Sequence, residues 1–410
     1  MASNAKNLAE LLNTDSTVAV GDIADGSVST AKLADDAVTS AKLGASAVDA
    51  TALASNAVTT AKVADGAVTS VKTTGVSGAA KNVIINGDMQ IAQRATSATG
   101  LGNDNGYFTC DRWRHVFNSS GRITSSQSTD TPDIGFSNSL KFACTTADTS
   151  IASGEYFFFS QKIEGQNLQH FGKGTSSAKA FAVSFYVKGN AAATYALELY
   201  DADNNRQCSK SFNVTTSWNR IELIFPADTT GAFDHDENAS LVLSWWLHAG
   251  TDYTSGTLNS SAFASNTNAN RALSTTSFFD STSRTFFITG VKLEPVQVTD
   301  FEHEDRGIVF QQCRRYYRKN PSLQGAMDSS NTNFVCMGFP GNDMRGGGGT
   351  GAVIATSNKL HNPGVTFYNL NSSGHGGVYT AYCQLSPATT WGTRNPGIIS
   401  QDCLEMDAEL

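Results

Sequence analysis

The chain has 410 residues, a length that predicts two or three domains, and a net charge of −8 with only 16% charged residues. It has no basic stripe, which argues against nucleic acid as a partner, and no apolar run near the roughly 18 residues that membrane insertion requires. The first residues lack the apolar core of a signal peptide, so we expect no secretion. The seven cysteines are widely spaced and odd in number, which favours free thiols made in a reducing cytoplasm; they are Cys110, Cys144, Cys208, Cys313, Cys336, Cys383 and Cys403.

The first 80 residues differ in composition from the rest of the chain. No Phe, Tyr, Trp, Pro, Cys or His occurs before Tyr107, although the chain contains 23 Phe, 11 Tyr and 5 Trp. A segment without large apolar side chains cannot bury enough surface to offset its own chain entropy. This part is therefore either disordered or ordered by association. Within residues 1–20, Asn7 to Leu12 have the pattern of a short amphipathic helix, with a frayed terminus as the alternative.

Residues 21–80 contain a strict ten-residue repeat. From residue 23 the rows read IADGSVSTAK, LADDAVTSAK, LGASAVDATA, LASNAVTTAK and VADGAVTSVK. One such chain cannot close a core, but identical chains side by side add an apolar layer with each row, which predicts a shaft. The spacing fits neither a heptad nor a period of two, so helical turns and an intertwined β-type shaft both stay open, and a flexible linker is the alternative. The predicted shaft core is Ile23, Val28, Leu33, Val38, Leu43, Val48, Leu53, Val58, Val63 and Val68.

Residues 81–305 change to short runs in which apolar and polar residues alternate, as is typical of β-strands. The clearest runs are Phe181 to Val187, Tyr195 to Leu199 and Leu241 to Leu247, and residues 201–206 form a polar turn. Short strands joined by polar turns predict an antiparallel β-sandwich of the jelly-roll kind. Long helices do not alternate with these strands, which argues against an α/β enzyme fold.

The alternation also predicts a candidate binding face on the middle sheet. If the apolar residues of these runs point to the core, the opposite face collects aromatic rings and carboxylates. Flat rings beside carboxylates suit a sugar, because its C–H face stacks on the ring while its hydroxyls bond the polar groups. The same residues equally suit contact with another module or subunit, and a register slip of one would exchange the faces. The candidates are Tyr186, Glu198, Tyr200, Glu222, Trp246 and His248.

A loop at residues 233–237 carries three carboxylates, those of Asp234, Asp236 and Glu237. Carboxylate oxygens from one loop suit a calcium ion, although most such loops are simply solvated. The same carboxylates are the only feature that favours the acid–base chemistry of a glycosidase. No zinc, phosphate-loop or nucleophile-elbow motif accompanies them, so the sequence favours a protein that is not an enzyme and needs no other cofactor.

The C-terminal part begins with a predicted short linking helix over residues 306–320, which Pro321 ends. Residues 321–410 then return to strand-like runs, at residues 333–339, 364–370 and 376–385, and predict a small second β module. The glycine run at residues 345–351 lacks the Lys-Ser/Thr of a phosphate loop, so we interpret it as a flexible loop.

Several stretches resemble parts of phage tail-fibre proteins. The first, residues 82–94 with Cys110-Asp-Arg-Trp113, resembles the opening of their jelly-roll modules. Residues 286–294 with 300–303 resemble their closing strand, Gln312 to Tyr317 resembles the helix after it, and the ten-residue repeat resembles the shafts of cyanophage-type fibres. The resemblance implies a homotrimeric virion fibre with a carbohydrate-binding-like sandwich, whose residues 1–20 anchor it to tail or adaptor proteins. It implies no catalytic residues.

Together these features predict a structural tail-fibre protein of the virion, assembled in the host cytoplasm, that attaches to a host polysaccharide or lipopolysaccharide. Three copies of a weak site give avidity, so weak individual contacts suffice. A purely architectural virion protein without glycan binding, such as a head fibre, a capsid decoration or a tail adaptor, is the alternative. A tailspike depolymerase is disfavoured, because the sequence shows no long β-helix repeat after residue 80.

Overall fold

The computed structural model describes residues 82–318, apart from residue 274, with their side chains, and the backbone of further strands up to residue 407. It also describes Glu409 and a few single residues of the repeat. The chain divides into two compact units, Met1–Ser77 and Gly78–Leu410. In the first unit Leu33, Val38 and Val58 are 44%, 52% and 58% exposed in the single chain. Val63 is half-buried, and the other predicted shaft-core residues lie outside the described residues: Ile23, Val28, Leu43, Val48, Leu53 and Val68.

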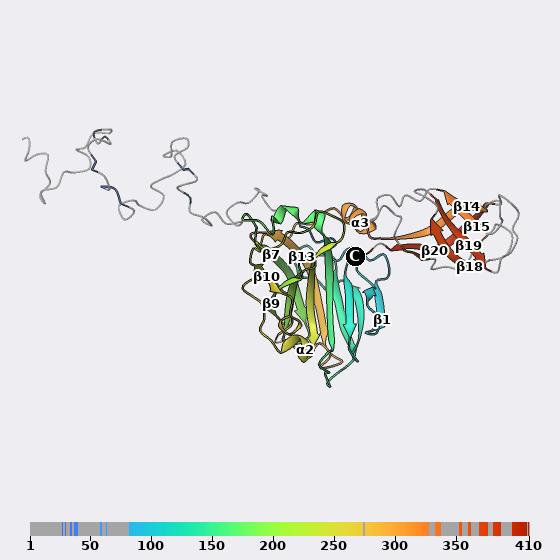
Figure 1. The fold of residues 1–410 in the computed structure, drawn as a ribbon, viewed down its shortest axis with the longest axis horizontal. Coiled ribbons are helices and arrows are strands. Elements are labelled where there is room, and N and C mark those ends of the chain that lie inside the picture. The colour runs from blue at the N-terminus through green and yellow to red at the C-terminus, as the bar shows by residue number, and fades with distance from the viewer. Residues whose placement is uncertain are drawn as a thin grey trace, which may run out of the picture. The chain divides into compact units, whose positions relative to one another are not determined.

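The second unit contains a β-sandwich of two antiparallel sheets (Figure 1). The six-stranded sheet has the order β1(Ser97–Leu101), β4(Arg122–Ser128), β5(Ser139–Thr146), β13(Thr285–Pro295), β7(Phe181–Gly189) and β10(Asn219–Phe225). The seven-stranded sheet has the order β12(Ala264–Ser265), β9(Arg206–Val214), β8(Ala193–Asp201), β11(Ala239–Ala249), β6(Tyr156–Glu164), β3(Arg114–Asn118) and β2(Gly106–Tyr107). The chain passes repeatedly from one sheet to the other, so the predicted mainly β, jelly-roll fold is confirmed.

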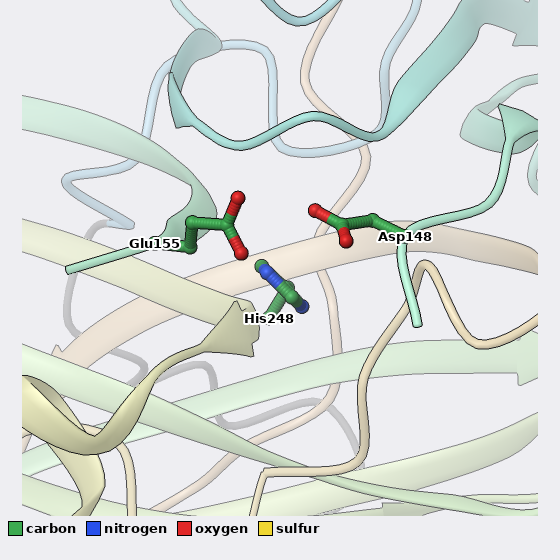
Figure 2. Close-up of side chains that lie close together, drawn as sticks. All are labelled: Asp148, Glu155 and His248. Carbon is green, nitrogen blue, oxygen red and sulfur yellow. The ribbon is translucent and has the colours of Figure 1, made fainter. Parts of the chain in front are cut away.

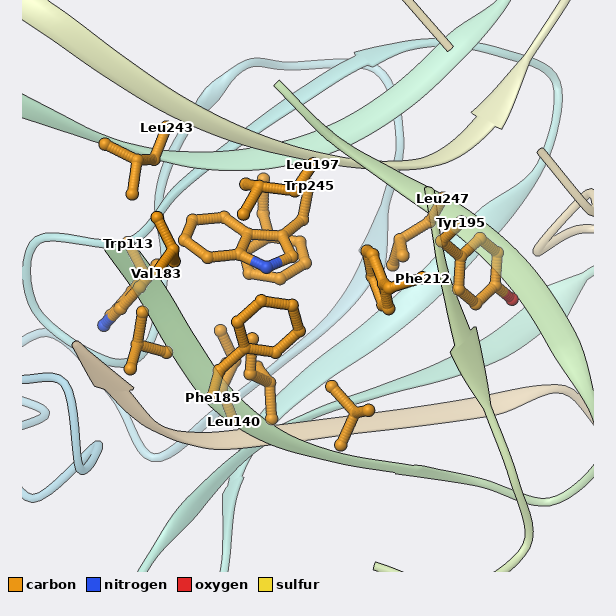
Figure 3. Close-up of a cluster of buried hydrophobic side chains, with 14 of the residues drawn as sticks. Trp113, Leu140, Val183, Phe185, Tyr195, Leu197, Phe212, Leu243, Trp245 and Leu247 are labelled. Carbon is orange, nitrogen blue, oxygen red and sulfur yellow. The ribbon is translucent and has the colours of Figure 1, made fainter. Parts of the chain in front are cut away.

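Alternating side chains of the two sheets build one core between them (Figure 3). Trp245 lies near its centre, stacked on Phe159 at 5.3 Å between ring centroids and edge-on to Trp113 at 5.5 Å and Phe185 at 5.7 Å. Each such ring, fully removed from water, contributes about 1.5–3 kcal/mol to folding. The alternation read from the sequence places the inward residues of β7, β8 and β11 correctly.

The segment that precedes β1 fixes the end of the sandwich through its side-chain amides. Asn82 donates to the Val291 carbonyl at 3.1 Å and accepts from the amide of Leu293 at 3.0 Å. The side-chain amide of Asn86 donates to the Ile91 carbonyl and accepts from the Ile91 amide, both at 2.9 Å. The backbone carbonyl of Asn86 accepts from Trp113 Nε1 at 3.0 Å. Residues 82–94, the stretch that resembles the opening of fibre modules, therefore hold the core in place through these hydrogen bonds. We call residues 82–94 the bracket.

Between residues 82 and 318 the helices are short: α2(Thr251–Thr254), α3(Arg306–Arg314), and the 3-10 turns η6(Gly165–Asn167), η7(Gln169–Phe171) and η8(Asn268–Asn270). Asp305 caps α3 by accepting from the Gly307 amide at 2.8 Å. The predicted linking helix over residues 306–320 is too long, because a strand, β14(Tyr317–Met327), begins at Tyr317 and contains Pro321. Tyr316 and Tyr317 are buried under Arg112 and Arg94, whose guanidinium carbons lie 3.4 Å and 3.6 Å from the ring centroids, and these contacts end the helix.

A third antiparallel sheet follows (Figure 1). Besides β14 it contains β15(Asn333–Met337), β16(Ala352–Ile354), β17(Leu360–His361), β18(Asn369–His375), β19(Thr380–Ser386) and β20(Pro396–Asp407). Of the predicted strand at 364–370, residues 369–370 belong to β18, which pairs with β19, and residues 364–368 lie outside the described residues. The glycine run at 345–351 lies outside the described residues.

Two further observations concern the described part of the chain. None of its helices has both the length and the apolar character that crossing a bilayer would require. The four cysteines whose side chains are described are buried free thiols: Cys110, Cys144, Cys208 and Cys313. Burial raises the pKa of the Cys144 thiol to about 11, so it stays protonated near neutral pH.

Candidate functional site

The six predicted glycan-binding residues do not share one face. Tyr186 on β7 and Glu222 on β10 belong to the six-stranded sheet, whereas Glu198, Tyr200, Trp246 and His248 belong to strands β8 and β11 of the seven-stranded sheet. The error arises at residues 190–192, a connection of three residues that carries the chain from one sheet to the other instead of forming a hairpin.

Glu198 and Trp246 meet on the outer face of the seven-stranded sheet, but both are fully buried. The Glu198 carboxylate accepts hydrogen bonds from Trp246 Nε1 at 3.0 Å and from Arg271 Nε at 2.7 Å. Tyr253 of α2 covers the Trp246 indole at 5.3 Å between ring centroids. A sugar cannot stack on a ring that is already covered, so this arrangement is internal packing around a buried ion pair.

His248 is also fully buried, with Nδ1 hydrogen-bonded to Ser277 Oγ at 2.9 Å. Burial lowers the pKa of its imidazole to about 4, although the nearby charge of Asp148 acts in the opposite direction. His248 is therefore neutral at physiological pH and is inaccessible to a glycan.

The other three predicted residues remain partly accessible but are spread over the two sheets. Tyr200 donates its hydroxyl to Asn205 Oδ1 at 3.1 Å. Glu222 is exposed and pairs with Arg220 at 3.3 Å. The Tyr186 ring lies 5.4 Å from that of Phe136, and burial raises the pKa of its hydroxyl. Tyr186 and Glu222 share the outer face of the six-stranded sheet, where both flank Arg220, whose guanidinium carbon lies 5.9 Å from the Tyr186 ring centroid. Tyr200 lies apart from them, on the other sheet.

The carboxylates predicted to hold calcium point to different partners. Asp236 accepts from the amide of Asn238 at 2.9 Å, Glu237 lies 3.6 Å from Arg315, and Asp234 is exposed. Among the residues with described side chains, the only convergent group of three His, Cys, Asp or Glu is a different one, at Asp148, Glu155 and His248. The calcium prediction at this loop is therefore wrong in its geometry.

A pocket of about 630 Å³ lies where three segments of the second unit meet, at residues 82–85, 164–170 and 312–316. Side-chain amides are frequent in its lining, which consists of Asn82, Val83, Ile85, Glu164, Gln166, Asn167, His170, Gln312, Arg315 and Tyr316. Val83 and Ile85 supply apolar surface, while Gln166, Asn167 and His170 are exposed at η6 and η7. We call this the amide pocket.

A buried ion pair organises the amide pocket. Glu164, fully buried at the end of β6, accepts from Arg315 Nε at 3.2 Å and from Gln166 Nε2 at 2.5 Å. Burial acts to lower the pKa of Arg315, but the hydrogen bond and charge of Glu164 outweigh it and raise the pKa. Burial also raises the pKa of Tyr316 to about 12. The pair leaves the pocket without net charge and with fixed donors and acceptors.

His170 gives the amide pocket a group that can both donate and accept. Burial, with the charge of Lys179, lowers the pKa of its imidazole, so the ring is neutral at pH 7. Its ring lies against Phe171 at 4.6 Å between centroids.

The sequence did not point to the amide pocket, because its residues come singly from distant segments. One signal was present: Asn82, Val83 and Ile85 belong to the first stretch that resembles fibre proteins, and Gln312, Arg315 and Tyr316 belong to the last. The two stretches are joined across the sandwich by Gln93 Nε2, which donates to the Tyr317 carbonyl at 2.9 Å.

Comparison with known proteins found no matching family model and no matching curated protein. Among solved structures, the chain is similar to a family 11 carbohydrate-binding module from Clostridium thermocellum in complex with a β-1,3-1,4-mixed-linked tetrasaccharide. That match has 12% identity over 50% of this chain and 99% of the module, with a TM-score of 0.25. A family 61 module in complex with β-1,4-galactotriose matches with 13% identity over 52% of this chain and 99% of that one, at a TM-score of 0.27. The enzymatically active domain of bacteriophage CBA120 tailspike protein 4 matches with 14% identity over 52% of this chain and 21% of that one, also at a TM-score of 0.27.

Proposed function

We propose that this protein is a structural virion fibre protein that attaches to a bacterial surface glycan, and that the amide pocket is its glycan contact. The single observation that carries the glycan part is the pocket itself: a cavity of about 630 Å³ lined by side-chain amides, an imidazole, a phenol and the paired charges of Glu164 and Arg315. The ten-residue repeat supports the fibre part.

The size and chemistry of the pocket suit one or two sugar residues. Ligand pockets usually measure about 300–1,000 Å³, and this one lies within that range. A sugar hydroxyl is both a donor and an acceptor, and so is a side-chain amide. The side-chain amides of Gln166 and Asn167 already point toward Glu164. Gln166 Nε2 lies 2.5 Å and Asn167 Nδ2 lies 3.4 Å from Glu164 Oε2.

Weak binding at one pocket is sufficient if several copies act together. A pocket open to solvent gives low affinity for a single sugar, because each sugar hydroxyl exchanges a hydrogen bond to water for one to protein at little net gain. A homotrimer linked by the repeat would present three such pockets and gain avidity without new contacts.

The test uses purified lipopolysaccharides and capsular polysaccharides from a panel of bacteria, immobilised as an array. Wild-type protein should bind at least one, and Asn167→Ala with His170→Ala should reduce that binding at least tenfold, because both side chains are exposed at the pocket. Asn213→Ala with His235→Ala, at exposed positions absent from its lining, is the matched control and should bind normally.

The other outcomes are equally informative. Normal binding by the pocket variant would refute the amide pocket as the contact, and loss on Tyr186→Ala or Tyr200→Ala would then return attention to the outer faces. Wild-type protein that binds no glycan in its assembled form would favour the purely architectural role, as a head fibre, capsid decoration or tail adaptor.

A further inference from the structure

A cluster of three potential metal ligands lies outside the lining of the amide pocket. Asp148 follows β5, Glu155 directly precedes β6, and His248 lies near the end of β11. One ligand atom from each lies within 4.8 Å of the others. Figure 2 shows the two carboxylates and the imidazole turned toward a common point.

One imidazole nitrogen of His248 has no hydrogen-bond partner among the described residues. His248 is fully buried, and its Nδ1 is hydrogen-bonded to Ser277 Oγ at 2.9 Å. Ser277 Oγ also accepts from the amide of Phe279 at 3.1 Å, which fixes the hydroxyl. Nε2 has no hydrogen-bond partner among the described residues, although it is buried. A ring held through Nδ1 with its Nε2 lone pair free is the usual arrangement of a metal-binding histidine.

Backbone and hydroxyl donors hold both carboxylates in place. Asp148 Oδ2 accepts from Ser119 Oγ and from the amide of Ser120, each at 3.2 Å. Glu155 Oε2 accepts from the amide of Ala152 at 2.7 Å. Over residues 82–318 apart from residue 274, neither carboxylate forms an ion pair with Lys or Arg. Two neighbouring negative charges without a cation repel each other, so the cluster attracts a positive ion.

The backbone around the cluster is tightly constrained. Gly250 donates its amide to the Glu155 carbonyl at 2.8 Å, and the amide of Asp148 donates to the Phe279 carbonyl at 2.8 Å. A Cβ at Gly250 would lie 2.1 Å from the Ala152 carbonyl oxygen, so only glycine allows this approach. The ligands therefore sit on a rigid frame that links the β5–β6 connection to β11.

We propose that Asp148, Glu155 and His248 bind a divalent transition-metal ion, of which Zn²⁺ is the representative. One imidazole nitrogen with two carboxylate oxygens suits zinc and its neighbours better than calcium or magnesium, which prefer oxygen ligands alone. Tetrahedral zinc with bonds of about 2.0–2.2 Å places its ligand atoms about 3.4 Å apart, so ligand atoms that lie within 4.8 Å of one another must move closer by up to about 1.4 Å. Glu155 is partly exposed, so its side chain can make that movement by rotation while its backbone stays in place.

The experiment measures Zn²⁺ binding by titration calorimetry on the full chain after chelator treatment. Wild-type protein should bind one ion per chain, and Glu155→Gln should weaken binding at least tenfold, because the amide keeps the shape but loses the charge. Glu222→Gln removes the charge of an exposed glutamate elsewhere and should bind like wild type. Asp148→Asn provides a second isosteric variant, with circular dichroism to verify folding.

A Co²⁺ spectrum separates this site from adventitious binding. Visible d–d bands that Glu155→Gln abolishes, without a thiolate charge-transfer band, would support the Asp–Glu–His ligand set, since the buried cysteines would otherwise contribute sulfur. Zn²⁺ binding that is equal in wild type, Glu155→Gln and Asp148→Asn, or no binding by folded wild type at micromolar Zn²⁺, would overturn the proposal. Neither outcome depends on the array experiment for glycans.

Discussion

His115 is a polar residue buried among aromatic rings of the sandwich core. It is fully buried and neither ring nitrogen has a hydrogen-bond partner among the described residues. Its ring lies parallel to Phe108 at 5.5 Å and edge-on to Phe142 at 5.1 Å. Burial lowers its pKa from 6.5 to about 3, so the imidazole is neutral in the folded protein and behaves as an aromatic packing group.

This burial predicts an acid-sensitive fold. Because the unfolded chain binds a proton at His115 near pH 6.5 and the folded chain only near pH 3, the free energy of unfolding falls as the pH drops through that window. At about 1.4 kcal/mol per pKa unit, the loss reaches several kcal/mol. His115→Phe should flatten this dependence in chemical denaturation between pH 7 and 4, and raise stability by about 1–2 kcal/mol at pH 7 by removing two unpartnered buried nitrogens.

The matched control is His235→Phe, at an exposed position in the loop before β11. It should leave the pH dependence of the free energy of unfolding unchanged. An unaltered acid transition in His115→Phe would show that other groups, among them the buried His248, set the acid limit.

At the scale of elements, the bracket over residues 82–94 depends on close contact between backbones. Gly87 accepts a hydrogen bond from the Val291 amide at 2.9 Å, and a Cβ on Gly87 would lie 2.2 Å from the Val291 carbonyl oxygen. Such a distance cannot be relieved by a side-chain rotation, because both groups belong to the backbone. The bracket and β13 must separate if residue 87 has a side chain.

Gly87→Ala should therefore cost about 2–4 kcal/mol of unfolding free energy, which is a large effect for one methyl group. Urea denaturation followed by tryptophan fluorescence measures it, since Trp113 is hydrogen-bonded to the bracket through Asn86. Gly154→Ala is the control, because its added Cβ would meet no atom closer than 3.5 Å. Equal effects of the two substitutions would contradict the close approach.

The same elements show what the sequence determines locally and what it does not. Alternation is a local pattern, so the inward residues of β8 and β11 could be identified before the structure was known. The burial of Trp246 could not, because its cover comes from Tyr253 and Ala272, in an irregular connection without periodicity. For the same reason the amide pocket and the Asp148 cluster, assembled from distant segments, left no local pattern.

At the scale of the whole molecule, the repeat makes a prediction about association. Leu33, Val38 and Val58 are large apolar residues exposed to water in the single chain. The other rows of the repeat carry the same residue types at the corresponding positions. Packing these side chains against identical chains would stabilise the assembly by about 25 cal/mol per Å² of apolar surface buried. We expect the full chain to form a homotrimer, and a chain that starts at Asn82 to be monomeric.

Light scattering on both purified proteins measures this directly. A full-length trimer with a monomeric shortened chain is the expected result. A full-length monomer near 43.4 kDa would contradict a self-assembling shaft. A trimer that persists without residues 1–81 would place the association in the β modules instead.

The bracket has a mechanical consequence for a protein under tension. The chain enters the sandwich at Asn82, which is hydrogen-bonded directly to Leu293 in β13, ten or so residues before the chain leaves through α3. A pull applied to the chain before residue 82 and after residue 305 is therefore transmitted through these few bonds and β13. The twelve strands from β1 to β12 lie outside that load path, so the domain can hold its fold while the chain on either side of it is stretched.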